Sequence, residues 1–476
     1  FNNFIWRFAQ TEGNYNFSSG SRGKGNLSSE ANPYFLFPQI YNFRYNIFSS
    51  EWPVANRVIE LYLQKKSENG GWERQINGIS NNEKAVLLLE KRTFKELLVD
   101  MELRNLQNNI VGQEASRLFA RAEINMGVEA FRDSLYSLLK RNTFLNIKFE
   151  NMLDTLGEIS RTDIRSLLGE WEKTTPLPFY SLGEPTLTKI TNKGGEEFFV
   201  LKMLISNNSD YDGIIHMDIR KDGWWYQPLE DPRAKTKIEM PAHTSKEFVS
   251  VWEDQIRNVE INTMVSGNLP NIISQDINNV KQERNKIVKD SIYILPESSF
   301  DLPGEIIVDN EDSTLFILSA PPIVGLLPKW LDEVEETPFK YSGISWWRPP
   351  LQWTATTNDR YYGKYIRSAF VIKSGDGSQT ATWKVPVPEV GQYDLYYHVF
   401  KDDELRWNNN LQGEYHFKVK YGSEVEDAYV NLRKANEGWE QLGSYYFDSD
   451  TIRVVLTDEC KLRSVTADAV KIVKRY

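Results

Sequence analysis

The spacing of apolar residues changes once along this chain, near residue 185, and that change limits the folds the chain can adopt. Between residues 51 and 175, apolar side chains recur every three or four positions, which is typical of amphipathic helices. Pro176 then stops helix formation. The pattern predicts an α-helical domain over residues 1–180, with one long helical stretch from about Asn82 to Asn108.

Beyond this point apolar and polar residues alternate, which is the period of half-buried strands. The runs 198–205 and 213–219 flank a turn-forming cluster of Asn, Ser and Asp, and predict a small Ig-like β-sandwich over residues 181–275. The polar residues 276–303 are predicted as a linker, and strand-like alternation returns over 304–476. The predicted fold class is therefore multidomain α + β, with an N-terminal α-helical domain followed by two β-sandwich domains.

Composition removes several classes of function. One cysteine among 476 residues excludes an internal disulfide framework and a cysteine-based zinc site, and the four histidines are never three or four positions apart. The net charge of −10 argues against nucleic-acid binding, which requires a basic surface. The longest uncharged apolar run, residues 313–328, contains three prolines, so no membrane span is expected. No signal peptide is visible, so we expect either a processed chain or a piece of a longer protein.

The helical part resembles the region after the catalytic centre in aminopeptidase N-type (gluzincin) zinc metallopeptidases. The similarity rests on an apolar helix ending at Gly127, a Phe-Glu-Asn-Met-Leu segment at 149–153 and a terminal Trp171. The next predicted domain is similar to the small β-domain of that family. The family's zinc site needs His-Glu-x-x-His, yet the first histidine here is His216. The resemblance therefore implies a peptidase-like region without a zinc site, and neither a catalytic residue nor a cofactor is assigned.

Five motifs in the last third of the chain resemble the golvesin-type domain, which also occurs at the C-terminus of xanthan lyases. They are Glu305-Ile-Ile-Val-Asp-Asn-Glu-Asp312, Tyr361-Tyr-Gly-Lys-Tyr-Ile366, Gly391-Gln-Tyr-Asp-Leu-Tyr-Tyr397, Trp439-Glu-Gln-Leu-Gly-Ser-Tyr-Tyr-Phe447 and Val465-Thr-Ala-Asp-Ala-Val-Lys-Ile-Val473. Residues 313–345 are longer and richer in proline than the usual connection. The resemblance implies a jelly-roll-like sandwich of secreted bacterial enzymes that binds glycans, and hence a periplasmic, cell-surface or secreted location.

Aromatic residues in the predicted loops of this domain are the candidate glycan-binding residues, because the C–H face of a sugar stacks on a ring. The candidates are Trp346, Trp347, Trp353, Tyr361, Tyr362 and Trp407, with Asn358, Asp359 and Asn408 as polar partners. The alternative, that these rings pack between the loops and the sandwich, remains open. Trp383 and Trp439 lie on predicted strands and are predicted to be core residues.

Other side chains that could bind a metal ion or react can also be explained by a purely structural role. Asp309, Glu311 and Asp312 are candidate calcium ligands, and a solvated turn is the alternative. His398 and His416 lie on strands expected to be neighbours, but two histidines without a third ligand are usually structural. Cys460 is predicted to be a buried apolar residue.

Two functions remain open. In the first, the chain is a non-catalytic accessory region of a secreted or cell-surface bacterial protein. Its C-terminal sandwich binds a polysaccharide or cell-wall glycan, and its helical domain offers a surface to a protein partner. In the second, it is a fragment of a metallopeptidase whose zinc-binding domain lies upstream of Phe1 or has been lost. A His-Glu-x-x-His helix upstream of Phe1 would favour the second function, and glycan binding would favour the first.

Overall fold

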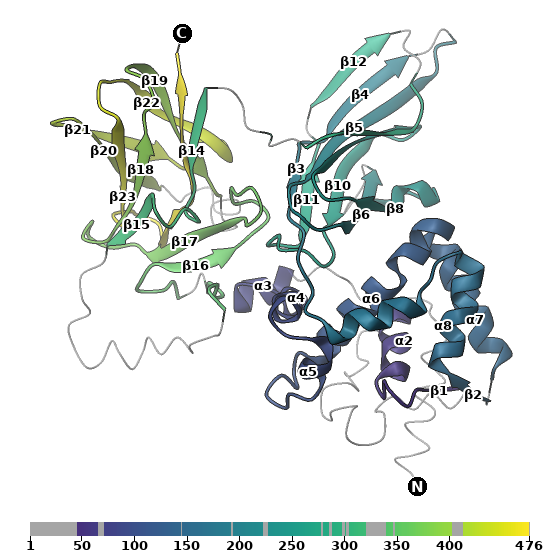
Figure 1. Ribbon diagram of the computed structural model, residues 1–476. Coiled ribbons are helices and arrows are strands. Elements are labelled where there is room, and N and C mark those ends of the chain that lie inside the picture. The colour runs from purple at the N-terminus through teal and green to yellow at the C-terminus, as the bar shows by residue number, and fades with distance from the viewer. Residues whose placement is uncertain are drawn as a thin grey trace.

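The structure is a computed structural model of the chain, and helices and strands occupy different parts of it (Figure 1). It describes residues 45–475 apart from 65–70, 144, 192–193, 222–226, 278, 285–287, 298–299, 301–303, 320–338, 346–347 and 402–412. The mixed α + β composition agrees with the prediction, and the strands form several sandwich-like sheets. Among the described residues, no helix combines the length and apolar character that crossing a membrane requires.

The helical unit packs around one apolar core. Its elements are β1 (Tyr45–Phe48), α2 (Ala55–Leu63), α3 (Gly71–Asn77), α4 (Asn81–Lys91), α5 (Phe94–Leu98), α6 (Gln107–Met126), α7 (Val128–Arg141), β2 (Leu145–Lys148), α8 (Phe149–Ser160) and the 3₁₀ helix η1 (Arg165–Glu172). Trp171 lies at the centre of the core, with ring centroids 5.0 Å from Trp52 and 4.8 Å from Phe94. The first and last parts of this unit therefore pack against its middle through these three rings.

The long helical stretch predicted between Asn82 and Asn108 is wrong, because the helix breaks at Thr93. The Thr93 hydroxyl accepts a hydrogen bond from Glu96 N at 3.2 Å, and the Glu96 carboxylate accepts one from Thr93 N at 2.9 Å. This capping box starts a new helix, since it satisfies amide groups that a continuous helix would pair internally. Ser80 and Glu83 form a second capping box at the start of α4.

Burial of the acidic residue Glu60 opposes the preference of its charge for water. Glu60 on α2 is 7% exposed, and burial raises the pKa of its carboxyl to about 7, although Arg57 at 3.3 Å opposes that rise. A folded-state pKa above the unfolded value contributes stability that is complete below about pH 4.5 and lost as the pH rises through about 7. Ionised Glu60 is thus a cost to the fold at alkaline pH.

A Glu60→Gln variant is expected to be more stable than the parent at pH 8, by up to about 3 kcal/mol, and nearly equal to it at pH 5. Glutamine has the shape of the neutral acid but never ionises. Urea unfolding of both proteins at the two pH values measures the difference. A difference that does not change with pH would contradict the assignment to Glu60.

The middle unit is a β-sandwich whose two sheets enclose a second core. Its elements are β3 (Tyr180–Leu182), β4 (Thr186–Thr191), β5 (Glu197–Asn207), β6 (Gly213–Lys221), β7 (Gln227–Pro228), the 3₁₀ turn η2 (Pro232–Ala234), β8 (Lys235–Met240), β9 (Thr244–Trp252), β10 (Ile256–Asn262), β11 (Ile272–Asp276), β12 (Val280–Arg284) and β13 (Ser291–Pro296). One sheet has the order β12-β4-β5-β9-β13, and β6 and β10 are the central strands of the other.

The linker predicted over residues 276–303 is wrong for much of its length. Strand β12 pairs in parallel with β4, and β13 pairs antiparallel with β9, so both belong to the sandwich. Backbone pairing, rather than burial of apolar side chains, holds β13 in place. Ile292 to Leu295 of β13 are each at least 40% exposed.

The C-terminal unit is a second all-β body around its own core. Its strands are β14 (Glu305–Val308), β15 (Phe316–Ser319), β16 (Thr354–Thr357), β17 (Ser368–Lys373), β18 (Thr380–Pro386), β19 (Gly391–Val399), β20 (Glu414–Tyr421), β21 (Glu424–Asn431), β22 (Gly438–Phe447), β23 (Thr451–Thr457), β24 (Ser464–Ala467) and β25 (Val470–Lys474). They form sheets in the orders β14-β25-β19-β22, β15-β18-β23-β20-β21 and β16-β17-β24.

All three units meet at one junction, where Ile79, Leu269, Tyr341 and Ala355 form a small apolar cluster. The sandwich loop between β10 and β11 reaches both neighbours. Leu269 N donates to Tyr365 O at 3.0 Å, and Asn271 N donates to Glu83 Oε1 at 3.0 Å. Thr357 Oγ1 donates to Gly78 O at 2.6 Å, which joins the C-terminal and helical units directly. The three units therefore share buried contacts and are not connected by flexible linkers alone.

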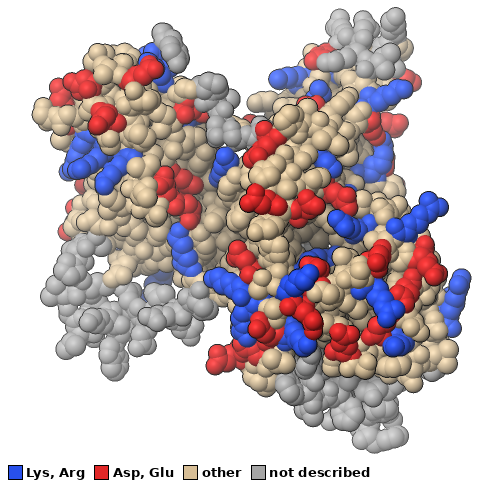
Figure 2. All heavy atoms as spheres, in the orientation of Figure 1, with Lys and Arg blue, Asp and Glu red and all other residues tan. Residues whose placement is uncertain are grey.

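Charged side chains of both signs are mixed over the helical unit on the face shown in Figure 2. No extended basic surface is seen on that face among the described residues. Mixed charge of this kind gives little general attraction for a polyanion, in line with the net charge of −10.

Candidate functional site

Five of the nine residues predicted to contribute to glycan binding can be placed. Trp346, Trp347, Trp407 and Asn408 lie outside the described residues. Trp353 is half-buried and packs against the C-terminal core. Tyr361 is 6% exposed, and its ring lies 4.5 Å from that of Phe400. For these two rings the structure has the packing arrangement that the sequence left open as the alternative.

The predicted polar partners have structural partners of their own. Asn358 Oδ1 accepts a hydrogen bond from Arg360 N at 3.0 Å, and Asn358 N donates to Arg367 O. The Arg367 guanidinium donates to Asp359 O at 2.7 Å. These bonds close the loop that carries Tyr361 and Tyr362, so the loop positions the tyrosines.

Tyr362, the last of the described candidates, is half-exposed and belongs to a larger aromatic group. Its ring centroid lies 5.0 Å from that of Trp439 and 5.8 Å from that of His398. The rings of His398 and Trp439 are 5.2 Å apart and nearly perpendicular. Cross-strand pairing explains this contact, because His398 of β19 lies opposite Trp439 of β22.

The group extends along the outer face of the same sheet. Tyr396 shares a face with His398, since residues two apart on a strand point the same way. Lys471 of β25 lies opposite Tyr396, and its ammonium is 5.4 Å from the Tyr396 ring and 4.9 Å from the Trp439 ring. We name Tyr362, Tyr396, Trp439 and Lys471 the aromatic platform.

Hydrogen-bonding groups continue this face beyond the rings. Asp394, two residues before Tyr396, accepts hydrogen bonds from Gln441 Nε2 at 3.1 Å, Ser444 Oγ at 2.5 Å and Arg475 Nε at 2.8 Å. Glu305 accepts one from Lys471 Nζ at 3.0 Å. The face therefore combines half-exposed rings with amide, hydroxyl and charged groups, the composition of a polar-ligand site.

A buried carboxylate fixes the platform from beneath. Asp468 is fully buried, lies 2.8 Å from His398 Nδ1 within hydrogen-bond distance, and accepts a hydrogen bond from Tyr362 N at 3.2 Å. Its backbone carbonyl accepts a hydrogen bond from Trp383 Nε1 at 3.2 Å. Burial raises the pKa of the Asp468 carboxyl, and its interactions with His398 and Tyr362 oppose that rise. Asp468 thus joins the loop, the histidine and the core below them.

The two tryptophans predicted to be core residues differ in the structure. Trp383 is fully buried, as predicted. For Trp439 the prediction is wrong, because the pairing of β22 with β19 shifts register at Leu395 and turns this ring to the half-exposed outer face. Sequence reasoning also missed Tyr396 and Lys471, although their positions alternate with the buried Leu395, Tyr397 and Ile472, a signal that was present.

The acidic cluster is engaged with protein donors. Glu311 accepts hydrogen bonds from Lys340 Nζ at 2.6 Å, from Tyr341 Oη at 3.0 Å and from the Ser368 hydroxyl. Thr314 Oγ1 donates to Asp312 at 2.9 Å, and burial raises the pKa of Asp309 well above its usual range. Among the described residues, no group of three His, Cys, Asp or Glu side chains is arranged to hold a metal ion.

The prediction that His398 and His416 lie on neighbouring strands is wrong, since β19 and β20 belong to different sheets. His416 Nε2 instead contacts Asp427 at 2.7 Å, and its ring stacks on Tyr429. Cys460 is half-buried at the edge of the C-terminal core and not inside it.

Comparison with known families identifies part of the C-terminal unit. Residues 349–474 match the family described as the Golvesin C-terminal domain. The predicted golvesin-type resemblance is therefore confirmed over these residues, which contain the whole platform. The match does not reach the helical region, whose resemblance to aminopeptidase N stays a prediction. No curated protein matches the chain.

Several solved structures share partial likeness with the chain. A Paenibacillus xanthan lyase has 16% identity and a TM-score of 0.26, over 63% of this chain and 26% of that one. TmCBM61, in complex with β-1,4-galactotriose, has 13% identity and a TM-score of 0.14, over 36% and 86%. A Bacteroides uniformis β-glucuronidase has 12% identity and a TM-score of 0.18, over 63% and 30%. TM-scores this low do not establish a shared overall fold.

Proposed function

We propose that the C-terminal unit binds carbohydrate through the aromatic platform. The observation that carries the proposal is the grouping of Tyr362, Tyr396 and Trp439 with Lys471 on one sheet face of the region that matches the Golvesin C-terminal domain. A sugar ring has an apolar C–H face and a rim of hydroxyls. The half-exposed rings can stack on the C–H face, and the neighbouring polar groups can hydrogen-bond with the hydroxyls.

The binding mechanism follows from the roles of these groups. Trp439 and Tyr396 supply stacking surfaces on adjacent strands, and Lys471 lies within cation–π distance of both rings and orders them. Gln441 and Asp394 lie along the same face and can exchange hydrogen bonds with hydroxyls. Because Asp468 holds the loop of Tyr362 from within, little ordering is needed on binding.

A Trp439→Ala variant is expected to weaken polysaccharide binding by at least about tenfold, which corresponds to about 1.4 kcal/mol. The measurement is calorimetry or affinity electrophoresis with a panel that includes xanthan, β-1,4-galactan and a cell-wall preparation. Tyr429→Ala removes a 55% exposed ring from β21 in another sheet and is the matched control. The proposal fails if no polysaccharide binds, or if both variants bind as the parent does.

For the chain as a whole, we propose a non-catalytic accessory role in a secreted or cell-surface protein. The proposal draws on the golvesin match and on the platform, which has stacking and hydrogen-bonding groups. Incubation with a bound polysaccharide should release no new reducing ends and no unsaturated sugars. The competing metallopeptidase interpretation predicts a zinc-binding segment encoded upstream of Phe1, which the gene sequence would reveal.

A further inference from the structure

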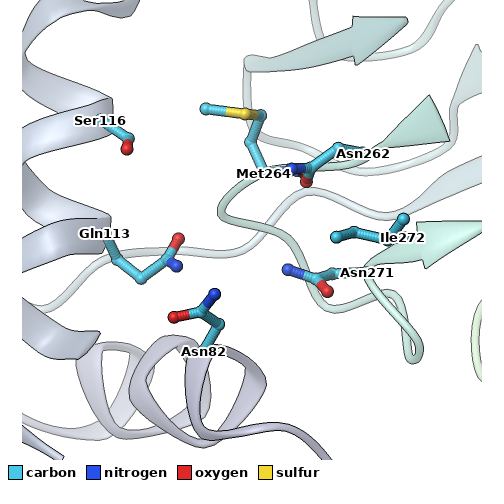
Figure 3. Close-up of a pocket in the computed structure, with 7 residues that line it drawn as sticks. All are labelled: Asn82, Gln113, Ser116, Asn262, Met264, Asn271 and Ile272. Atoms are coloured by element: carbon cyan, nitrogen blue, oxygen red, sulfur yellow. Dashed lines mark hydrogen bonds between the residues drawn. The ribbon is translucent and has the colours of Figure 1, made fainter. Parts of the chain in front are cut away.

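A small pocket lies between the helical unit and the sandwich, away from the platform (Figure 3). Asn82 of α4 and Gln113 and Ser116 of α6 face it from the helical side. The sandwich side is formed by Asn262, Met264, Asn271 and Ile272 at the β10–β11 connection. Five of these seven side chains are uncharged hydrogen-bonding groups, and none is ionisable.

Part of this hydrogen-bonding capacity is unused by the protein. Asn82 Oδ1 accepts from Asn109 Nδ2 at 2.8 Å, and Asn262 Oδ1 accepts from Met264 N at 2.8 Å. The side chains of Gln113, Ser116 and Asn271 have no hydrogen-bond partner among the described residues. Asn271 is only 5% exposed, and its amide points toward the helices in Figure 3. The Asn271 amide therefore faces the pocket with a donor and an acceptor that a ligand can use.

The chemistry of the lining selects the class of ligand. A carboxamide both donates and accepts hydrogen bonds, as does a hydroxyl, so this lining complements neighbouring hydroxyls on a neutral molecule. It offers no counter-charge for a phosphate or carboxylate. Met264 and Ile272 add apolar contact for C–H groups. The cavity of about 30 Å³ has room for about two hydroxyl-sized groups, so only the edge of a ligand can enter.

We propose that this pocket binds one edge of a neutral sugar residue, through two adjacent hydroxyls. The inference does not rest on the proposed function of the platform, which lies in a different unit. Because the pocket is lined from both the helical unit and the sandwich, a bound sugar would stabilise their contact and raise the unfolding temperature of the chain.

The test uses the full chain carrying Trp439→Ala, so that the platform does not contribute. Thermal shift and calorimetry with galactose, glucose, mannose and glycerol are expected to show binding of at least one sugar, with glucuronate as the charged comparison. Gln113→Leu should weaken that binding about tenfold, because it leaves the sugar hydroxyls unpaired. Gln75→Leu makes the same change at an exposed position on α3 and should leave binding unchanged.

Two results would overturn the proposal. One is the absence of binding by every neutral sugar of the panel, which would assign the pocket to ordered water alone. The other is equal affinity in the Gln113→Leu and Gln75→Leu chains. Ser116→Ala, a smaller change on the same face of α6, guards against misfolding of the leucine variant and should also weaken binding.

Discussion

A Gly343→Ala substitution is expected to separate the C-terminal unit from the helical unit. The added Cβ would lie 2.7 Å from Asn77 N and closer still to the carbonyl of Ile76. These are backbone atoms at the C-terminal end of α3, so no side-chain rotation can relieve the clash. A Cβ added to Gly78, on the opposite side, would lie 2.4 Å from Ser342 N. Two backbones in contact at this point leave no room for a methyl group.

The cost of that clash is about 3 kcal/mol, the upper range for overpacking, and it falls on a junction with few buried residues. Opening the contact also breaks the hydrogen bond from Thr357 to Gly78. Small-angle X-ray scattering should show a larger radius of gyration, and the junction should become sensitive to limited proteolysis. Gly169→Ala, which meets no atom within 4 Å, is the control. Identical scattering and proteolysis for both variants would contradict the prediction.

Trp439 shows the limit of predicting side-chain exposure from the pattern of a single strand. Counting back by twos from the buried Phe447 and Tyr445 places Trp439 on the inner face, as predicted. The register of β22 against β19 shifts at Leu395, so Leu442 is an extra residue and packs inward. A bulge of this kind reverses which residues face out. Trp439 therefore points outward, a result of strand pairing that no single-strand pattern contains.

The adjacent residues Tyr361 and Tyr362 show the same limit in a loop. Both belong to the same golvesin-type motif. Tyr361 is nevertheless buried against Phe400, whereas Tyr362 is half-exposed beside Trp439. A motif identifies the domain without stating which ring faces solvent. The pocket between the helical unit and the sandwich was harder still to predict from the sequence, because its lining residues, such as Asn82 and Asn271, come from separate units.

A local strand pattern correctly predicted the burial of Trp383, whereas the linker prediction failed on strand pairing. The burial of Trp383 follows from its central position in a strand-like run, and it is fully buried. The linker prediction failed because β13 is an edge strand whose apolar residues stay exposed, so its membership in the sheet rests on pairing with β9. Edge strands carry little burial pattern for a sequence to display.

A Glu83→Ala variant should lose about 3–5 kcal/mol of stability, the range for breaking a buried ion pair. Glu83 is 1% exposed, and Arg74 Nε donates to its carboxylate at 3.0 Å. The same carboxylate accepts from Ser80 N at 2.6 Å, which caps α4, and from Asn271 N at 3.0 Å, which belongs to the sandwich. Removing it leaves Arg74 as a buried charge without its partner and uncaps a helix at the three-unit junction.

Urea unfolding followed by circular dichroism and by tryptophan fluorescence measures this loss. Glu96→Ala is the matched control, because Glu96 forms the same capping box with Thr93 on α5 but is exposed and contacts no second unit through that box. We expect only a small change for that variant. Glu83→Gln, which keeps the shape and loses the charge, should fall between the two. If Glu83→Ala and Glu96→Ala unfold at the same urea concentration, the junction does not depend on this carboxylate.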